Sequence, residues 1–301
     1  MKIKFETVKD VLSHASSFIL HDVEEVTKLQ CSAFSDVDNF AISAYKKAFI
    51  EIRTGLRKLF RYVNIIHPED IPFKTFDGNG RIKIGQYLAQ NKPTLGDISV
   101  AMGTEKGNDA GMYHFTVNPI SNMPAFRRGI NNFTCDLFVH QKNADGNFTT
   151  SGVYSYNPIE NEALVYRDNC LLLNDYRLTA RDVTSLKTAV CSIVLQGVAN
   201  LVKVPKDLLH AGYVLFNDDF SSSIKNLFAN RVNFVVHCNL HKHDLLWLEI
   251  AVQAGYLIAR VGKTGELHII ENAADVPMLD ISSKAYSYII ATRKNMIFLG
   301  K

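Results

Sequence analysis

Residues 151–178 read SGVYSYNPIENEALVYRDNCLLLNDYRL, and this stretch decides the fold. Two runs rich in β-branched and aromatic residues, GVYSYN and EALVYRD, stand on either side of the turn sequence NPIEN. Runs of this kind, bounded by Asn, Pro and Gly, predict strands joined as hairpins. The stretch therefore predicts an antiparallel sheet in the middle of the chain.

The same pattern continues towards the N-terminus in DISVAMG (97–103), MYHFTV (112–117) and CDLFVHQ (135–141). Before it, residues 38–63 carry apolar residues at helical spacing, which predicts a long amphipathic helix with Asp38 or Asn39 as its N-cap. A second, shorter helix is expected near residues 81–90. Residues 38–183 are therefore expected to form an α+β part, and residues 1–37 a helical N-terminal extension without assigned chemistry.

Beyond residue 184 strand-like and helix-like segments alternate. The sequence predicts strands at 186–194, 232–238 and 256–262. It predicts helices at 221–231, with a serine cap, and at 241–255, ending at Gly255. Alternation of this kind is typical of an α/β arrangement, so residues 184–301 are expected to form a smaller α/β part.

The composition limits the classes of function. A 301-residue chain with 47% hydrophobic residues can bury a substantial core, and 33 basic against 30 acidic residues give a net charge of only +3. This balance argues against nucleic acid and anionic membranes as partners. The five cysteines form no CxxC pair, which favours a reducing compartment. Without an apolar run near 18 residues long, the expectation is a soluble, cytoplasmic protein.

The stretch FTVNPISNMPAFRRGINNF, residues 115–133, is the strongest candidate for a site. A β-branched run ends in Asn-Pro, and a polar turn then leads to Pro124 and an amphipathic segment. This pattern predicts a strand that delivers a turn onto a helix N-terminus, a usual place to hold a phosphate or a metal. The turn contains no carboxylate, however, so the charge that would bind a metal is missing.

The order of these segments is similar to that in the inositol monophosphatase family, the magnesium-dependent, lithium-sensitive sugar-phosphate phosphatases that include the bacterial extragenic-suppressor type. GTE (103–105) stands where the family has Gly-Glu-Glu. NPISNM (118–123) stands where the family has Asp-Pro-(Ile/Leu)-Asp-Gly-Thr. The hairpin is the best match, and the residues that it keeps in family order are Gly152, Asn157, Pro158, Asn161, Glu162, Asn174 and Arg177.

The resemblance covers residues 40–300 and implies a layered αβαβα sandwich that forms a homodimer. It also implies a site where carboxylates gather two or three Mg²⁺ ions, which clamp a phosphate and activate a water. The two aspartates of the family motif correspond to Asn118 and Ser121, and the water-orienting threonine corresponds to Met123. Two further metal ligands are implied, the carboxylate of Glu105 and the backbone carbonyl of Ile120.

The same resemblance implies two further ligand positions, for which the chain offers three aspartates. Asp77 is what remains of an earlier Asp-x-x-Thr-x-x-Asp loop. The last ligand comes from a Trp-Asp pair that opens a late helix, and it has two interpretations. HDLLWLEIAVQAG can be that helix, which makes Asp244 the ligand. The spacing to Gly255 favours instead the preceding family helix, which leaves Asp275 as the remnant of the Trp-Asp helix.

These departures predict a degenerate member of the family, a weak or inactive phosphatase that acts as a binding or interaction protein, with Mg²⁺ bound weakly or not at all. The alternative is an active Mg²⁺-dependent phosphatase that hydrolyses inositol phosphate or a related sugar phosphate. The expected ligand is a small phosphorylated molecule or inorganic phosphate. Asn122, Met123 and Arg127 are the predicted anion-binding residues, because the helix N-terminus favours negative charge. Zinc binding by His237, Cys238 and His241 is disfavoured, because no second ligand group follows at a recognised spacing.

Overall fold

The computed structural model describes residues 8–15, 17, 19, 22, 34–59, 65–66, 113–130, 132–142, 148–195, 204–217, 219–238, 240, 242–262, 265–279 and 286–299. The chain divides into two compact units, one of residues 1–72 and 84–168 and the other of residues 73–83 and 169–301. The expected boundary at residue 184 stays a prediction. Residues 81–90 and 97–103, expected to form a helix and a strand, lie outside the described residues.

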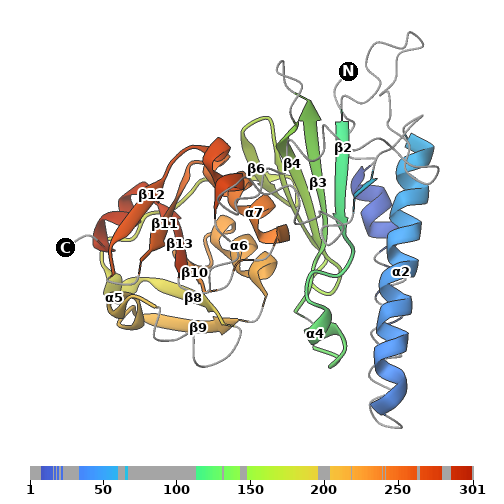
Figure 1. Ribbon diagram of the computed structural model, residues 1–301, viewed down its shortest axis with the longest axis horizontal. Coiled ribbons are helices and arrows are strands. Elements are labelled where there is room, and N and C mark those ends of the chain that lie inside the picture. Colours follow the sequence, from blue (N-terminus) through green and yellow to red (C-terminus); the bar gives the residue numbers. More distant parts are fainter. Residues whose placement is uncertain are drawn as a thin grey trace. The chain divides into compact units, whose positions relative to one another are not determined.

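The long helix α2 (Phe34–Leu59) belongs to the first unit and lies beside β2 (Tyr113–Asn118) in Figure 1. Small and apolar residues recur along it every three or four positions, so one side of the helix is buried. The buried positions are Ala41, Ala44, Ala48, Ile52 and Leu56. The predicted helix is confirmed, but its N-cap is not, because α2 already begins at Phe34 and includes Asp38 and Asn39.

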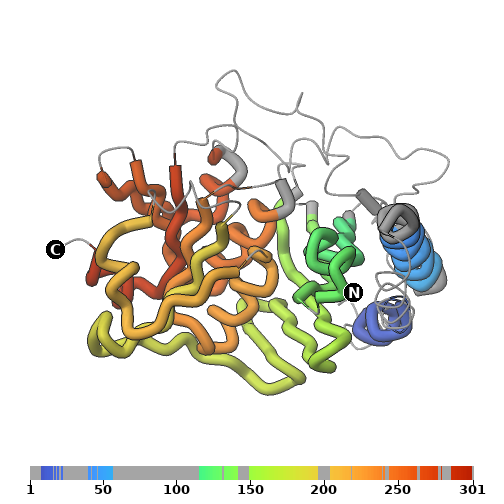
Figure 2. The backbone as a smooth tube through the Cα atoms, turned by 90° about the horizontal axis from the view of Figure 1, so that it is seen from below, coloured from blue at the N-terminus to red at the C-terminus, as the bar shows by residue number. Residues whose placement is uncertain are grey.

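Gly55 explains how the helical residues 8–15 approach α2. A Cβ atom at Gly55 would lie only 2.6 Å from Cγ1 of Val11, closer than side-chain atoms pack. Glycine lowers helix propensity by up to ~1 kcal/mol, so its place inside α2 serves close packing between two helical segments. Figure 2 shows these two segments side by side.

The first sheet has seven strands in the order β1-β2-β3-β4-β5-β6-β7. Besides β2, its strands are β1 (Ile65–Ile66), β3 (Cys135–Lys142), β4 (Phe148–Asn157), β5 (Glu162–Arg167), β6 (Cys170–Leu173) and β7 (Tyr176–Arg177). The β1 strand runs parallel to β2, whereas β2, β3, β4 and β5 pair antiparallel in succession. Between β5 and β6, Asp168 and Asn169 have φ of 49° and 57°, as a tight hairpin turn requires. The hairpins predicted from residues 151–178 are confirmed.

The second sheet has six strands in the order β12-β11-β13-β10-β8-β9. Its strands are β8 (Val190–Val194), β9 (Tyr213–Asn217), β10 (Phe234–His237), β11 (Tyr256–Val261), β12 (Leu267–Ile270) and β13 (Ser287–Thr292). The strands β9, β8 and β10 run parallel to one another, and the other pairs are antiparallel. This mixed sheet confirms the alternating pattern predicted for the last third of the chain.

Helices and short helical turns accompany the second sheet. They are η3 (Leu186–Thr188), α5 (Lys206–Leu209), α6 (Phe220–Phe228), α7 (Lys242–Gln253), η5 (Ala273–Met278), α8 (Arg293–Met296) and η6 (Ile297–Leu299). Gly255 has φ of +89° just after α7, which confirms its predicted role as a helix stop. The predicted serine cap of α6 was wrong, because the side chain of Asp219 accepts the N–H of Ser222 instead.

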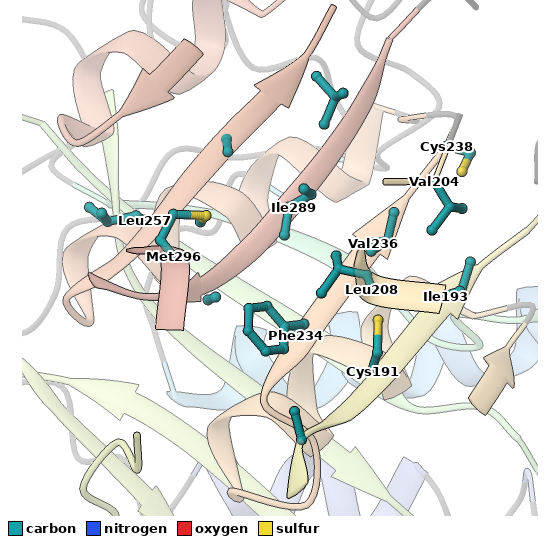
Figure 3. Packing of buried hydrophobic residues seen from close by; sticks show 14 residues of the cluster. Cys191, Ile193, Val204, Leu208, Phe234, Val236, Cys238, Leu257, Ile289 and Met296 are labelled. Carbon is teal, nitrogen blue, oxygen red and sulfur yellow. The ribbon is translucent and has the colours of Figure 1, made fainter. Parts of the chain in front are cut away.

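One face of the second sheet carries a continuous apolar core. Phe234, Val236, Ile289 and Leu257 project from neighbouring strands, and Leu208 of α5 packs against the cluster that they form, as Figure 3 shows. Cys191 lies within this cluster, and its burial raises the pKa of its thiol to about 12. None of the described helices is both long and apolar enough to cross a membrane.

Candidate functional site

The candidate site lies where β2 ends and leads into the one-turn helix α4 (Met123–Phe126). The predicted succession of strand, turn and helix is confirmed. The helix has only four residues, however, and Pro124 occupies its first turn. A macrodipole grows with the number of aligned peptide units, so a single turn offers little attraction for an anion.

Ser121 joins the turn to the segment before β3. Its backbone N–H donates to the carbonyl of Thr134 at 2.9 Å, and its Oγ accepts the N–H of Thr134 at 2.9 Å. The hydroxyl of Thr134, which is itself buried, donates to the same Oγ at 3.1 Å. The hydroxyl of Ser121, which the resemblance places where the family has its second aspartate, therefore connects two parts of the chain.

Asn122 is the N-cap of α4. Its side-chain oxygen accepts the N–H of Ala125 at 3.1 Å, and its backbone carbonyl accepts the N–H of Phe126 at 3.0 Å. Asn122 is only 4% exposed, and Arg128 donates from its guanidinium to the carbonyl of Pro124 at 3.0 Å. Two amides of the first turn are thus engaged within the helix. The anion-binding role of Asn122, Met123 and Arg127 stays a prediction.

Asn118 and its neighbours are buried against α2. The hydroxyl of Tyr45 donates to the side-chain oxygen of Asn118 at 3.4 Å, and Asn118 is 8% exposed. Ile120 is 1% exposed and belongs to a core cluster with Phe126 and Phe133, and Met123 packs against the same cluster. Met123, which the resemblance places where the family has a water-orienting threonine, therefore makes an apolar contact.

The sequence prediction missed two buried polar residues of β3. Asp136 is paired in register with Asn118 and accepts the hydroxyl of Ser155 at 2.7 Å. His140 lies between two hydroxyls, with its Nε2 2.7 Å from Thr116 Oγ1 and its Nδ1 3.2 Å from the Oγ1 of Thr150. The available signal was an acid and a histidine inside an apolar strand run, which indicates buried polar groups with partners.

The two candidates for the late ligand differ in environment, and both lie in the second unit. Asp244 stands in the first turn of α7 and is fully buried, with its Oδ2 2.8 Å from Nε2 of His237 at the end of β10. The ring of Phe220 lies against His237, with ring centroids 4.6 Å apart. Asp275 lies in η5 and is exposed.

The described residues do not match the ligand set that Mg²⁺ requires. Magnesium prefers anionic oxygens in near-octahedral geometry. Asn118 and Ser121 carry no charge, and their oxygens already accept hydrogen bonds from protein groups. Across the described part of the chain, no three His, Cys, Asp or Glu side chains gather as a metal group. Glu105 and Asp77 lie outside the described residues.

Comparison with known proteins gives a consistent result for the fold. No family model matches the sequence, and no curated protein does. Among solved structures, the extragenic suppressor protein suhB from Bartonella henselae matches with a TM-score of 0.65 at 15% identity, covering 100% of both chains. Inositol monophosphatase II from Staphylococcus aureus MSSA476 matches with a TM-score of 0.61 at 9% identity, covering 100% of this chain and 93% of the other.

A third match is the Staphylococcus aureus enzyme with inositol monophosphate bound, with a TM-score of 0.54 at 10% identity, covering 95% of this chain and 91% of the other. At such identities the likeness concerns the fold. The chain has the α+β layered fold of the inositol monophosphatases, as its motifs had indicated.

Proposed function

We propose that this chain is an inositol monophosphatase-fold protein in which hydrogen bonds replace the metal centre, and that it binds a ligand or partner with little or no hydrolysis. The observation that carries the proposal is the turn after β2. In this turn Asn118 and Ser121 would correspond to the side chains that hold the metal. The side-chain oxygen of Asn118 accepts a hydrogen bond from Tyr45, and that of Ser121 accepts two from Thr134. Catalysis by this fold relies on metal ions, so a turn rebuilt in this way supports a binding role.

Charge gives the physical reason. Two carboxylates replaced by an amide and a hydroxyl remove two negative charges from the ligand set, and the Coulomb attraction for a divalent cation falls with them. The same replacement suits the local packing, because uncharged groups can be buried when each has a hydrogen-bond partner. Asn118 and Ser121 therefore stabilise the turn in the absence of a metal.

We assign the place of the late ligand to Asp244 rather than Asp275. The helix α6 already precedes β10 and α7, so α6 supplies the earlier family helix and α7 supplies the helix that opens with an aspartate. This assignment differs from the alignment that the spacing to Gly255 favoured, in which Asp275 was the remnant of the late ligand. The carboxylate of Asp244 is paired with His237, which again replaces a metal contact by an internal one.

A small phosphorylated molecule is the proposed ligand class, and Asn122, Met123 and Arg127 are its proposed contacts, with the positive charge supplied by the guanidinium of Arg127 rather than by the one-turn helix. Structures of the same fold with bound 2′AMP and with bound inositol monophosphate support this class. Asn118 and Ser121 carry no negative charge that Mg²⁺ would have to balance. Such a ligand would therefore bind to the metal-free protein. The resemblance also supports a homodimer, and the cysteines, which form no CxxC pair, favour a cytoplasmic location.

The decisive experiment measures phosphate release from inositol 1-phosphate together with thermal unfolding, each with and without millimolar Mg²⁺. The expected result is no turnover above background and no rise in Tm, because only a ligand that binds the folded state stabilises it. The matched variant carries Asn118→Asp and Ser121→Asp. It should be less stable than wild type without metal and should recover stability when Mg²⁺ is added.

Turnover by the wild-type chain that is lost in Glu105→Gln would overturn the proposal in favour of an active Mg²⁺-dependent phosphatase. Ser121→Ala provides a further check on the turn, since it removes the acceptor of both Thr134 groups. It should lower the free energy of unfolding by about 1–3 kcal/mol, the usual cost when a buried donor loses its partner. An unchanged unfolding midpoint in urea would show that the hydrogen bonds of Ser121 do not hold the turn.

A further inference from the structure

Arg260 places a half-buried positive charge on the second sheet. It lies near the end of β11, between Ala259 and Val261, whose side chains belong to the apolar core of this sheet. Side chains alternate along a strand, so Arg260 projects from the opposite face, in line with the buried residues Tyr256 and Ile258. A charged side chain in such a row loses part of its hydration and needs an acceptor to compensate for the loss.

Among the described residues, none supplies that acceptor. The Nε atom of Arg260 is enclosed by the protein and has no hydrogen-bond partner, and the guanidinium forms no ion pair with a described acid. Glu271 pairs instead with Arg293 at 2.9 Å. Glu266 places its carboxylate in the space that a Cβ atom of Gly262 would occupy. The charge of Arg260 is therefore available to a group from outside the chain.

Tyr286 orients the guanidinium. Its ring lies just before β13, and the ring centroid is 4.8 Å from Cζ of Arg260, which is a cation–π distance. A stacked guanidinium keeps its plane and its N–H groups in a fixed direction, so that less conformational freedom is lost when an anion binds. Tyr286 is itself only half-buried, so the stacked pair reaches the surface.

His268 adds a second hydrogen-bond donor beside Arg260. It lies on β12 directly opposite Arg260 in the antiparallel register, and both side chains therefore stand on the same face. The Cβ atoms of two residues opposed in this way are about 4.5–5.5 Å apart. The imidazole is exposed and has no hydrogen-bond partner in the described part of the chain. A histidine ring can donate an N–H whether it is neutral or protonated.

We propose that Arg260 and His268 form a binding site for the phosphate group of a small molecule, with Tyr286 as the residue that orients the guanidinium. Arginine binds a phosphate through two parallel N–H···O bonds, and the imidazole can donate to a third oxygen. A carboxylate has only two oxygens and would leave His268 unused, so the pair of donors favours phosphate. The site belongs to the second unit and shares no residue with the anion contacts proposed for the turn after β2.

Calorimetry with inorganic phosphate, without metal, tests the site in an Arg127→Gln variant of the full chain, so that the turn contributes less to binding. Arg260→Met should raise the phosphate Kd by about 10-fold or more, because the bonds to a charged donor are lost. Arg260→Lys should not restore the affinity, since an ammonium cannot bind with two parallel bonds. Arg293→Met is the matched control, because Arg293 is a neighbouring arginine that already pairs with Glu271. An Arg127→Gln protein that binds no phosphate, or whose Kd is unchanged by Arg260→Met, would overturn the proposal.

The second donor and the class of ligand have separate tests in the same variant. His268→Ala should raise the phosphate Kd by about 3-fold to 10-fold, as expected when one hydrogen bond to an anion is lost. Acetate, which lacks the third oxygen, should bind more weakly than phosphate by a similar factor. Equal affinities for acetate and phosphate would show that the site does not select phosphate and would contradict the role of His268.

Thermal unfolding distinguishes a binding role of Arg260 from a purely structural one. Without phosphate, Arg260→Met should keep or raise the Tm, because it removes a half-buried charge that has no acceptor. Millimolar phosphate should raise the Tm of the Arg127→Gln protein but not that of the protein that also carries Arg260→Met. Circular dichroism verifies the fold of each variant. If Arg260→Met lowers the Tm and phosphate shifts both proteins equally, Arg260 only packs against Tyr286 and the proposal is wrong.

Discussion

At the residue scale, polar side chains that are largely buried form hydrogen bonds with other groups of the chain. Ser121 accepts from Thr134, Asn122 caps α4, Asp136 accepts from Ser155, and His237 pairs with Asp244. Each group is largely removed from water, where an unpaired polar atom costs about 1–3 kcal/mol. Hydrogen bonding inside the chain therefore explains how these polar side chains can be buried.

The buried pair of His237 and Asp244 should contribute to stability without any metal. Asp244→Ala should lower the free energy of unfolding by about 1–3 kcal/mol, because it removes the carboxylate that is hydrogen-bonded to the buried ring of His237. Asp275→Ala should change it by less than about 0.5 kcal/mol, as expected for an exposed side chain. Urea unfolding at neutral pH with chelator present measures both. Equal costs for the two variants would contradict the assigned roles.

The carboxyl group of Asp182 makes the stability of the folded protein depend on pH. The hydroxyl of Thr292 donates to it at 2.6 Å and lowers its pKa below the ordinary 3.8, and Lys294 at 3.2 Å lowers it further, whereas partial burial acts in the opposite direction. A lowered pKa stabilises the folded state above the ordinary value, and this stabilisation is lost as the pH falls through the lowered pKa. The contribution is therefore complete at neutral pH.

Asp182→Asn should consequently be less stable than wild type at pH 5 to 7, by less than about 1 kcal/mol because the lysine is exposed. The difference should shrink below pH 4. Chemical unfolding at a series of pH values measures it, and Lys294→Met should show a smaller difference of the same sign. A gap between wild type and Asp182→Asn that grows on acidification would show that the sign is wrong.

At the element scale, helix ends in the second unit depend on specific residues. Asp219 accepts the N–H of Ser222 at 2.9 Å and its hydroxyl at 2.6 Å, and so caps α6. Gly255 ends α7 with a positive φ that other residues adopt at a cost. A sequence pattern places such helices well, but which of several neighbouring polar residues caps them depends on local backbone geometry.

Asp219→Ala should destabilise the protein by about 1 kcal/mol, with a range of 0.5–2, because the first turn of α6 loses its acceptor. Asn272→Ala is the matched control, since Asn272 caps the exposed helical turn η5 through the N–H of Ala274. Its cost should be smaller, because water can replace an exposed acceptor. Thermal unfolding, monitored by circular dichroism, measures both costs. An Asp219→Ala variant with the same Tm as wild type would refute the capping role.

At the scale of the whole molecule, the segment after β7 belongs with the second sheet. The N–H of Arg181 donates to Asn230 at 2.8 Å, and the N–H of Val183 donates to Asn295 at 2.8 Å. Asn295 is fully buried beside β13. Residues 179–183 are therefore held by groups far along the chain, although the sequence assigned them to the first part.

Native hydrogen exchange should detect this attachment. The amide of Val183 should be protected to nearly the level of the β13 amides, because its acceptor is buried in the second unit. Asn295→Ala should remove this protection and lower stability by about 1–3 kcal/mol. Asn230→Ala should expose the amide of Arg181 but leave that of Val183 protected. Fast exchange of Val183 in the wild-type chain would place the boundary near residue 184.

The sequence by itself determined the elements that local patterns encode. Apolar residues at helical spacing predicted α2 and α7, and β-branched runs between turn residues predicted β2 to β5. The order of these segments was sufficient to identify the fold, although no single motif is intact. The absence of carboxylates at Asn118 and Ser121 was equally a property of the sequence. These features are local, because propensity and periodicity act over a few neighbouring residues.

Only the tertiary structure decided which groups meet. The partnership of Ser121 with Thr134 spans 13 positions, that of Tyr45 with Asn118 spans 73, and that of Val183 with Asn295 spans 112. Composition and spacing do not specify such pairs, since they depend on strand register and on how elements pack. The same reason explains why Asp136 and His140 were missed. Chain folding, which brings distant residues together, determined the site.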